Sequence, residues 1–330
     1  MRPREKSRGK ARRDRPVTTV TEAQTMAPRF LWLDLTRKCQ LRCTHCYNSS
    51  GPDGTHGAMP HDEWISVLDQ AARLGVRSVQ FIGGEPTMHP HAAALAEHAL
   101  ALGLHLEIFS NLVHITAEWW TLLQRAGASL ATSYYSDHAA DHNAMTGRPS
   151  HARTRENIVK AVRLGIPLRV GVIGDSEEIT DAARRDLESL GVTRIGVDHV
   201  RPFGRGGQDQ DSDASGLCGR CGSGRAAIGP GGEVSPCVFS GWMSVGNVQE
   251  DALGAILGGG AMAEANAAIR SAVRTQPELQ CEPKRCYPDH SPCYPAQTPC
   301  NPQGQVPPAC SPDDQECSPG TPSTYCNPRR

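Results

Sequence analysis

Three closely spaced cysteines near the start of the chain constrain its fold and chemistry more than any other feature. Cys39, Cys43 and Cys46 are separated by three and then two residues, directly after the apolar segment FLWLDL at 30–35. Three thiolates can hold three irons of a cubane iron–sulfur cluster and leave the fourth iron open for a substrate or cofactor. The alternative is a structural zinc site in which His45 supplies the fourth ligand.

The overall composition describes a soluble globular protein. The chain has 330 residues and a formal net charge of −1, so no global field favours nucleic acid. No apolar run reaches the roughly 18 residues that a membrane span needs, and the basic N-terminus lacks an apolar signal core. We therefore expect a cytoplasmic protein with no nucleic-acid or membrane partner.

The thirteen cysteines fall into separate groups. Their odd number fits poorly with a complete set of internal disulfides, and the expected compartment also disfavours disulfides. No cysteine lies between Cys46 and Cys218, whereas seven lie in the last fifty residues. This clustering indicates separate metal sites on a scaffold without thiols.

Strand-like and helix-like segments alternate from residue 30 onward. Strands are expected at 30–36, 76–82, 104–109, 129–135, 166–173 and 193–200, and helices at 60–74, 91–102, 116–126, 154–164 and 180–190. Six such units of about thirty residues predict parallel strands joined by right-handed crossovers. The expected fold class is α/β, a partial (β/α)6 TIM-like barrel followed by a small cysteine-rich domain.

Polar residues and glycines collect where the expected strands end. In barrels of this kind the chemistry gathers at the carboxyl ends of the strands. The cysteine loop follows the first strand, Gly83-Gly84-Glu85-Pro86 the second, Ser110-Asn111 the third, and Ser133 lies near the end of the fourth. Paired glycines allow a ligand to approach the backbone closely.

The pair of motifs CQLRCTHCY and GGEP resembles the radical S-adenosylmethionine (SAM) superfamily. The resemblance implies that Cys39, Cys43 and Cys46 bind a 4Fe-4S cluster whose open iron chelates SAM. It further implies SAM contacts from the strand-end residues and from the aromatic residue after the last cysteine: Tyr47, Gly83, Gly84, Glu85, Pro86, Ser110, Asn111 and Ser133. The loop histidines His138, His142 and His151 receive no role, and no catalytic acid, base or hydrogen donor is assigned.

A second cysteine group surrounds an expected hairpin at 226–234. The spacing of Cys218, Cys221, Gly232 and Cys237 resembles the SPASM and twitch extensions of radical SAM enzymes, which implies one or two auxiliary iron–sulfur clusters. The later spacings depart from the family pattern. We expect Cys281, Cys286 and Cys293 to contribute ligands, with structural zinc in the tail as the alternative. Twelve prolines from residue 281 onward exclude a helix or central strand there.

The expected organisation is a disordered basic tail at 1–27, a radical SAM barrel at 28–206, a SPASM-like domain at 207–280 and a Cys/Pro-rich tail at 281–330. Residues 202–213 are expected to form a linker.

The resemblance implies an enzyme that reductively cleaves SAM and abstracts hydrogen through a 5'-deoxyadenosyl radical. The first hypothesis is maturation of a ribosomally made peptide by crosslinking or epimerisation. It needs a peptide substrate, an external electron donor such as flavodoxin or ferredoxin, and a separate leader-recognition protein or direct docking. The alternatives are a small-molecule dehydrogenase or epimerase acting on an aminocyclitol or sugar, and a non-enzymatic iron–sulfur electron carrier.

Overall fold

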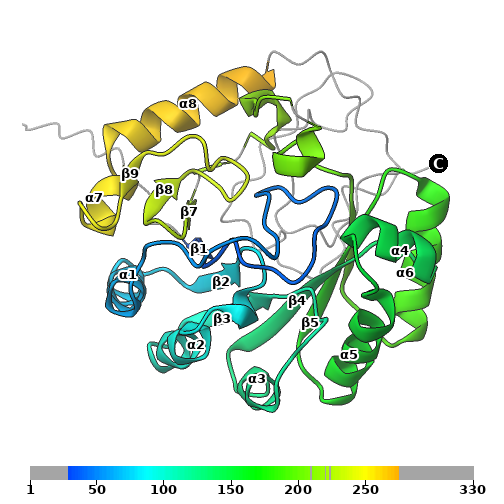
Figure 1. The fold of residues 1–330 in the computed structure, drawn as a ribbon. Helices are drawn as coiled ribbons and strands as arrows, with labels where there is room; N and C mark the ends of the chain where they lie inside the picture. Colours follow the sequence, from blue (N-terminus) through cyan, green and yellow to red (C-terminus); the bar gives the residue numbers. More distant parts are fainter. Residues whose placement is uncertain (1–28, 209, 220, 223, 275–330) are drawn as a thin grey trace, which may run out of the picture.

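A nine-stranded sheet forms the frame of the molecule in the computed structural model, which describes residues 29–208, 210–219, 221–222 and 224–274 (Figure 1). The strand order is β6-β5-β4-β3-β2-β1-β7-β8-β9. The first six strands pair in parallel, in chain order, which confirms the α/β class and the partial barrel. They are β1 (Phe30–Asp34), β2 (Ser78–Ile82), β3 (His105–Phe109), β4 (Ala128–Tyr134), β5 (Leu168–Ile173) and β6 (Ile195–Asp198).

The C-terminal unit extends the same sheet. Strand β7 (Arg225–Ile228) pairs in parallel with β1, and β8 (Glu233–Ser235) and β9 (Gly246–Asn247) continue in antiparallel fashion. The expected hairpin is therefore present, and it also joins the open edge of the barrel. Two helices follow it, α7 (Leu253–Leu257) and α8 (Gly260–Arg274).

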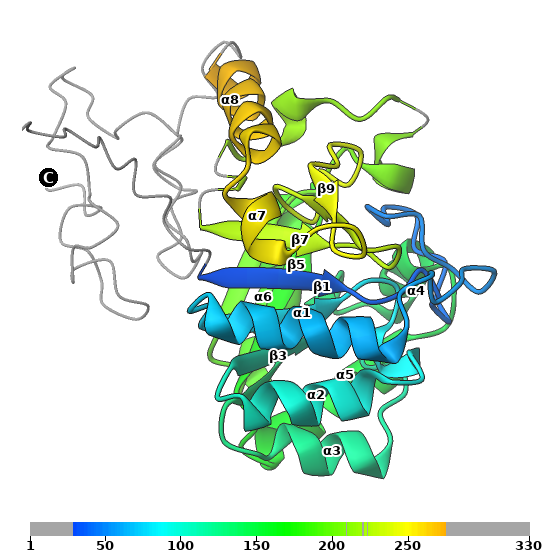
Figure 2. The same cartoon turned by 90° about the vertical axis from the view of Figure 1, so that its left-hand side faces the viewer.

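The helices between the strands lie along one face of the sheet. Figure 2 shows α1, α2 and α3 stacked side by side next to strands β1 and β3. The connecting helices are α1 (His61–Arg73), α2 (Ala92–Ala101), α3 (Ala117–Leu123), α4 (Ala139–Thr146), α5 (His151–Arg163) and α6 (Glu177–Ser189). Two of them begin at side-chain caps, because Thr116 accepts from the Trp119 N–H and Ser176 from the Ile179 N–H.

Alternation along the strands separates the core from the cavity. Leu31 and Leu33 of β1 are fully buried against the helices, as are Leu106 and Ile108 of β3. Trp32, which lies between the two leucines, lines a cavity on the other face. Because successive side chains of a strand point to opposite faces, one face of the sheet forms the core and the other remains available for ligands.

Two segments differ from the sequence expectation. Residues 139–146 form α4 where a loop was expected, and α5 begins at His151 rather than at residue 154. Helix α4 lacks a clear apolar face and buries only His142 and Thr146, so its sequence carries no helical periodicity. The expected linker is also packed, because Phe203 is only 2% exposed and belongs to a second hydrophobic cluster that includes Leu217 and Cys237.

No helix in the described part of the chain is long and apolar enough to cross a membrane. The expected N-terminal tail at 1–27 and the tail ligands Cys281, Cys286 and Cys293 lie outside the described residues.

Phe81 of β2 tests the helix-facing core. It is fully buried in the main hydrophobic cluster, so Phe81→Ala should lower the free energy of unfolding by about 3–5 kcal/mol. Leu102→Ala is the matched control, because Leu102 is 37% exposed and its loss should cost less than about 0.5 kcal/mol. Urea unfolding followed by circular dichroism measures both, and equal losses would contradict the assigned core.

Candidate functional site

The three cysteines of residues 39–46 lie on an irregular loop after β1 that opens onto a cavity of about 720 Å³. The cavity lies on the strand face opposite the covering helices. Cys39, Cys43 and Cys46 all line it, and so do Cys218 and Cys237 of the C-terminal unit. The two thiol groups that the sequence singled out therefore face one common space.

Burial affects the charge state of the thiols in this loop. Burial raises the pKa of the Cys39 and Cys43 thiols to about 12, and the neighbouring thiolates add to the shift. An ionised set of thiolates therefore needs a bound cation, which iron supplies. The Leu41 N–H donates to Cys39 Sγ at 3.4 Å and Asn111 Nδ2 at 3.6 Å, hydrogen bonds that suit a cluster ligand. The donor set fits a cluster held by three thiolates.

The glycine pair after β2 binds the backbone of the cysteine loop. Gly84 N donates to Thr36 O at 2.6 Å, and Glu85 N donates to Lys38 O at 2.9 Å. A Cβ on Gly84 would lie 2.3 Å from Lys38 O, and Gly83 has a φ of +132°. Glycine is required here because the turn lies directly against the backbone at Thr36 and Lys38. Both glycines also line the cavity.

The end of helix α4 holds the same loop from another side. The Arg42 N–H donates to Thr146 O at 3.1 Å, and the Thr44 N–H donates to Met145 O at 2.9 Å. Gly147 follows in the left-handed conformation, and a Cβ added there would lie 2.6 Å from Arg42 O. The helix that the sequence did not predict is therefore one of the supports of the thiols.

Glu85 is buried behind the cavity wall rather than exposed to it. It is 1% exposed, and its carboxylate accepts hydrogen bonds from Thr87 N at 3.1 Å, Thr87 Oγ1 at 2.7 Å and Asn111 N at 2.8 Å. Burial raises its pKa, and these hydrogen bonds oppose the shift. The carboxylate thus joins the end of β2 to the end of β3.

The other expected SAM residues divide between the cavity and its backing. Pro86 and Ser110 are buried, and Ser110 Oγ accepts from the Leu112 N–H at 3.1 Å. The expected SAM residues that line the cavity are Tyr47, Gly83, Gly84, Asn111 and Ser133. The sequence identified this set by its position at strand ends but could not separate lining residues from backing residues.

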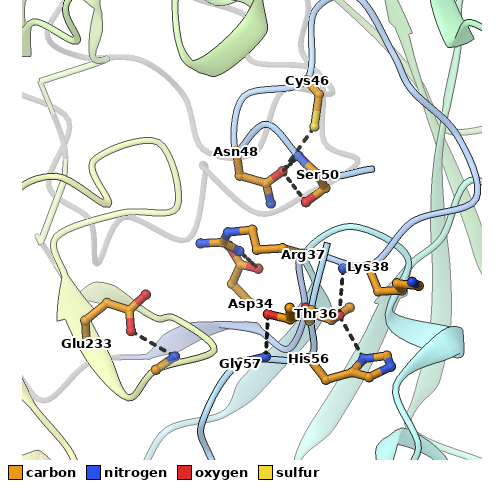
Figure 3. Close-up of polar contacts among 12 residues, drawn as sticks. Asp34, Thr36, Arg37, Lys38, Cys46, Asn48, Ser50, His56, Gly57 and Glu233 are labelled. Atoms are coloured by element: carbon orange, nitrogen blue, oxygen red, sulfur yellow. Dashed lines mark hydrogen bonds and ion pairs between the residues drawn. The ribbon is translucent and has the colours of Figure 1, made fainter. Parts of the chain in front are cut away.

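Separate polar contacts lie at the cysteine loop and at the end of β1 (Figure 3). Asp34 forms an ion pair with Arg37, and burial raises the pKa of the Asp34 carboxyl in spite of that pairing. Cys46 Sγ lies 3.1 Å from Asn48 Oδ1, which also accepts from Ser50 Oγ at 2.7 Å. The hydroxyl of Tyr47 is buried without a hydrogen-bond partner among the described residues.

An ion-pair ladder on the cavity wall was missed by the sequence reasoning. Arg169 of β5 donates two hydrogen bonds of 2.8 Å to the Glu107 carboxylate of β3, which also accepts from Gln80 of β2. All three side chains line the cavity. The sequence feature that could have revealed it is one polar residue in each of three otherwise apolar strands, at the position that faces the cavity.

The ring of His142 was expected in a solvated loop, but it is 1% exposed and lines the cavity. Tyr135 lies between His142 and His45, with ring centroids 5.1 Å and 4.7 Å away. Burial lowers the pKa of His142 to about 4, so the ring is neutral near pH 7. His151, in contrast, lies 2.7 Å from the Tyr134 hydroxyl.

The second thiol group is compact. Cys221 Sγ and Cys237 Sγ lie 3.4 Å apart, and both residues are buried. Hydrogen bonding with Cys218 and then with Cys237 raises the pKa of the Cys221 thiol. In the described ranges, no group of three or more His, Cys, Asp or Glu side chains is arranged as a site for a metal ion.

Two family profiles match the chain. The radical SAM superfamily profile matches residues 33–187, and the SPASM profile, described as an iron-sulfur cluster-binding domain, matches residues 218–287. The cysteine loop lies in the first match, and the second match starts at Cys218 and includes Cys237.

Curated relatives match about half of their own length. The PqqA peptide cyclase of Streptomyces rochei is 30% identical over 183 residues, covering 54% of this chain and 50% of that protein. The PqqA peptide cyclase of Xanthomonas campestris pv. campestris is 31% identical over 186 residues, covering 54% and 49%. An AdoMet-dependent heme synthase of Methanosarcina barkeri is 28% identical over 194 residues, covering 57% and 55%.

Solved structures share the fold at low sequence identity. Streptococcus suis SuiB bound to precursor peptide SuiA superposes with a TM-score of 0.60 at 16% identity, covering 78% of this chain and 69% of SuiB. The enzyme anSMEcpe with bound AdoMet superposes with a TM-score of 0.59 at 13% identity, covering 78% and 86%. This chain therefore shares the fold of SuiB and of anSMEcpe.

Gly84 tests whether the cysteine loop depends on its close backbone contact. Gly84→Ala should lower the free energy of unfolding by about 1–3 kcal/mol, because the added Cβ collides with Lys38 O. The same variant should retain less iron after anaerobic reconstitution. Gly241→Ala is the control, since a Cβ there meets nothing within 4 Å. Full stability and iron content in Gly84→Ala would contradict the contact.

Proposed function

We propose that the chain, which matches the radical SAM superfamily profile over residues 33–187 and the SPASM profile over 218–287, cleaves SAM to modify a ribosomally synthesised peptide. The observation that carries the proposal is the shared cavity of about 720 Å³, which Cys39, Cys43 and Cys46 line together with Cys218 and Cys237. A cavity of this size can take up a reacting side chain together with a cofactor.

In this proposal Cys39, Cys43 and Cys46 hold the SAM cluster. When bound, the cluster supplies the electron that cleaves SAM to methionine and a 5'-deoxyadenosyl radical. The protein's part is to fix the thiolates, through the N–H of Leu41 and the amide of Asn111 on Cys39, and to keep water away from the radical.

The proposed SAM contacts come from the cavity lining. The backbone at Gly83 and Gly84 approaches the ligand, Asn111 and Ser133 offer polar side chains, and the Tyr47 hydroxyl has no other partner among the described residues. Glu85, Pro86 and Ser110 act indirectly, because they set the positions of the turn and of Asn111 from behind. Residues that line the cavity are thus proposed to bind SAM, and the buried residues behind them to hold them in position.

The proposed auxiliary cluster uses Cys218, Cys221 and Cys237, with Cys281, Cys286 and Cys293 as the remaining ligands. A crosslink or an unsaturated bond forms when the substrate, after losing one hydrogen atom to the radical, also loses one electron and one proton. An auxiliary cluster held by these thiols would be placed to accept that electron, because Cys237 lines the same cavity as the SAM-site cysteines.

The peptide reading rests on two kinds of similarity. The curated relatives include proteins named PqqA peptide cyclase, and a structure that shares the fold holds a precursor peptide. We propose a peptide substrate, a flavodoxin or ferredoxin as electron donor, and a separate leader-recognition protein or direct docking. A ribosomally made peptide arises in the cytoplasm, where we expect the enzyme to act in natural product biosynthesis.

Two variants distinguish the role of the SAM-site cysteines from that of the auxiliary cysteines. Cys39→Ala/Cys43→Ala/Cys46→Ala should lose about four irons per chain and all SAM cleavage to 5'-deoxyadenosine. Cys237→Ala should keep SAM cleavage but lose peptide modification, because it changes only the auxiliary group. Iron and sulfide analysis and chromatography of 5'-deoxyadenosine measure both. SAM cleavage by the triple variant would refute the assignment of the SAM-site thiols.

The substrate class has its own test. The reconstituted enzyme is incubated with SAM, dithionite and synthetic peptides encoded beside its gene, and the peptides are analysed by mass spectrometry. A crosslink removes two hydrogen atoms from the peptide, whereas epimerisation in deuterated water replaces one hydrogen atom by deuterium. Turnover of an aminocyclitol or sugar, with no change in any peptide, would favour the small-molecule alternative. Absence of SAM cleavage would favour the electron carrier.

A further inference from the structure

The segment that follows β6 reaches back over the cysteine loop. It has the sequence PFGRGG at 202–207, and Gly204–Gly207 form a short 3₁₀ helix. Arg205 donates from its backbone N–H to Cys46 O at 2.9 Å. Its side chain donates from Nε to Cys43 O and from Nη2 to Ser50 O, both at 2.7 Å. One residue therefore contacts the loop at three carbonyl groups.

Glycines on both sides allow this approach. Gly204 has a φ of +54°, and a Cβ there would lie 2.4 Å from Cys46 O and from Tyr47 O. A Cβ on Gly206 would lie 2.4 Å from Arg201 O. Positions 204 and 206 therefore have no room for a side chain, and Arg205 between them is the residue whose side chain reaches the loop.

The Arg205 charge lies where it acts on the cluster ligands. Among the described residues its guanidinium donates to two carbonyl oxygens and forms no ion pair with a carboxylate.

We propose that Arg205 is a positioning residue of the SAM-cluster site that fixes the Cys43–Cys46 backbone and raises the reduction potential of the cluster. The inference rests on the proposed function of the three cysteines. A cluster with three thiolate ligands gains negative charge when it accepts an electron, and a fixed cation in a poorly solvated site stabilises that reduced state. The three hydrogen bonds keep the charge and the ligands in one arrangement.

The test compares Arg205→Gln with Arg205→Lys. The full-length reconstituted enzyme is reduced with dithionite at a series of fixed potentials, and the SAM-sensitive electron paramagnetic resonance (EPR) signal reports the reduced SAM cluster. In Arg205→Gln, the ratio of reduced to oxidised cluster at a given potential should fall about fivefold to tenfold. Arg205→Lys keeps the charge and should recover most of the wild-type ratio.

Arg153→Gln is the matched control, because Arg153 is an exposed arginine of α5 that pairs with Glu156. It should leave both the potential and the iron content unchanged. An unchanged potential in Arg205→Gln would overturn the inference. The inference would also be overturned if Arg205→Lys lowered the reduction potential as much as Arg205→Gln does, or if both variants lost the cluster. Either result would show no effect of the Arg205 charge on the potential.

The reduction titration is independent of turnover. If the wild-type protein binds a cluster but forms no 5'-deoxyadenosine with SAM, the proposed function fails. In that case the total EPR intensity of the reduced protein, compared with that of Cys39→Ala/Cys43→Ala/Cys46→Ala, still measures the effect of Arg205. The two failures are therefore distinguishable.

Discussion

Backbone hydrogen bonds onto one irregular loop are the interaction on which the site depends. Residues 39–46 have no helix or strand of their own, so their polar backbone groups need partners from elsewhere. Those partners come from Gly51, the carboxyl end of α4 and the segment at Arg205, while the glycine turn after β2 binds Thr36 and Lys38 just before the loop. Apart from Gly51, these segments are distant in sequence, and only the folded barrel brings them together. The positions of the three thiols are therefore a property of the whole fold.

The C-terminal unit is continuous with the barrel. Strand β7 pairs with β1, the strand that leads into the cysteine loop, so the sheet itself sets the position of the second thiol group. An aromatic contact reinforces this connection, because Tyr47 packs edge-on against Phe239 with centroids 5.1 Å apart. A radical site and an electron acceptor must lie near one substrate if both act on it. The shared cavity meets that requirement without a movement of domains.

Much of this arrangement could be predicted from local patterns. The six strand–helix units, the cysteine loop, the GGEP turn and the hairpin near Cys237 all carry short-range signals of periodicity or turn chemistry. Helix α4 escaped prediction because its residues lack an apolar face. The segment containing Arg205 resembled a linker, since glycine-rich composition does not reveal a packing partner about 160 residues away. The buried role of Glu85 likewise depends on Asn111, which only the assembled sheet brings close.

The central claim is that the loop of Cys39, Cys43 and Cys46 holds a cluster with one iron open to SAM. EPR and electron–nuclear double resonance of the reduced enzyme, with SAM labelled by ¹⁵N at its amino group, test it most directly. The account predicts that SAM changes the EPR signal and that the ¹⁵N nucleus couples to the cluster. It also predicts that Cys39→Ala/Cys43→Ala/Cys46→Ala abolishes the coupling. A reduced cluster whose spectrum is the same with and without SAM would contradict the account.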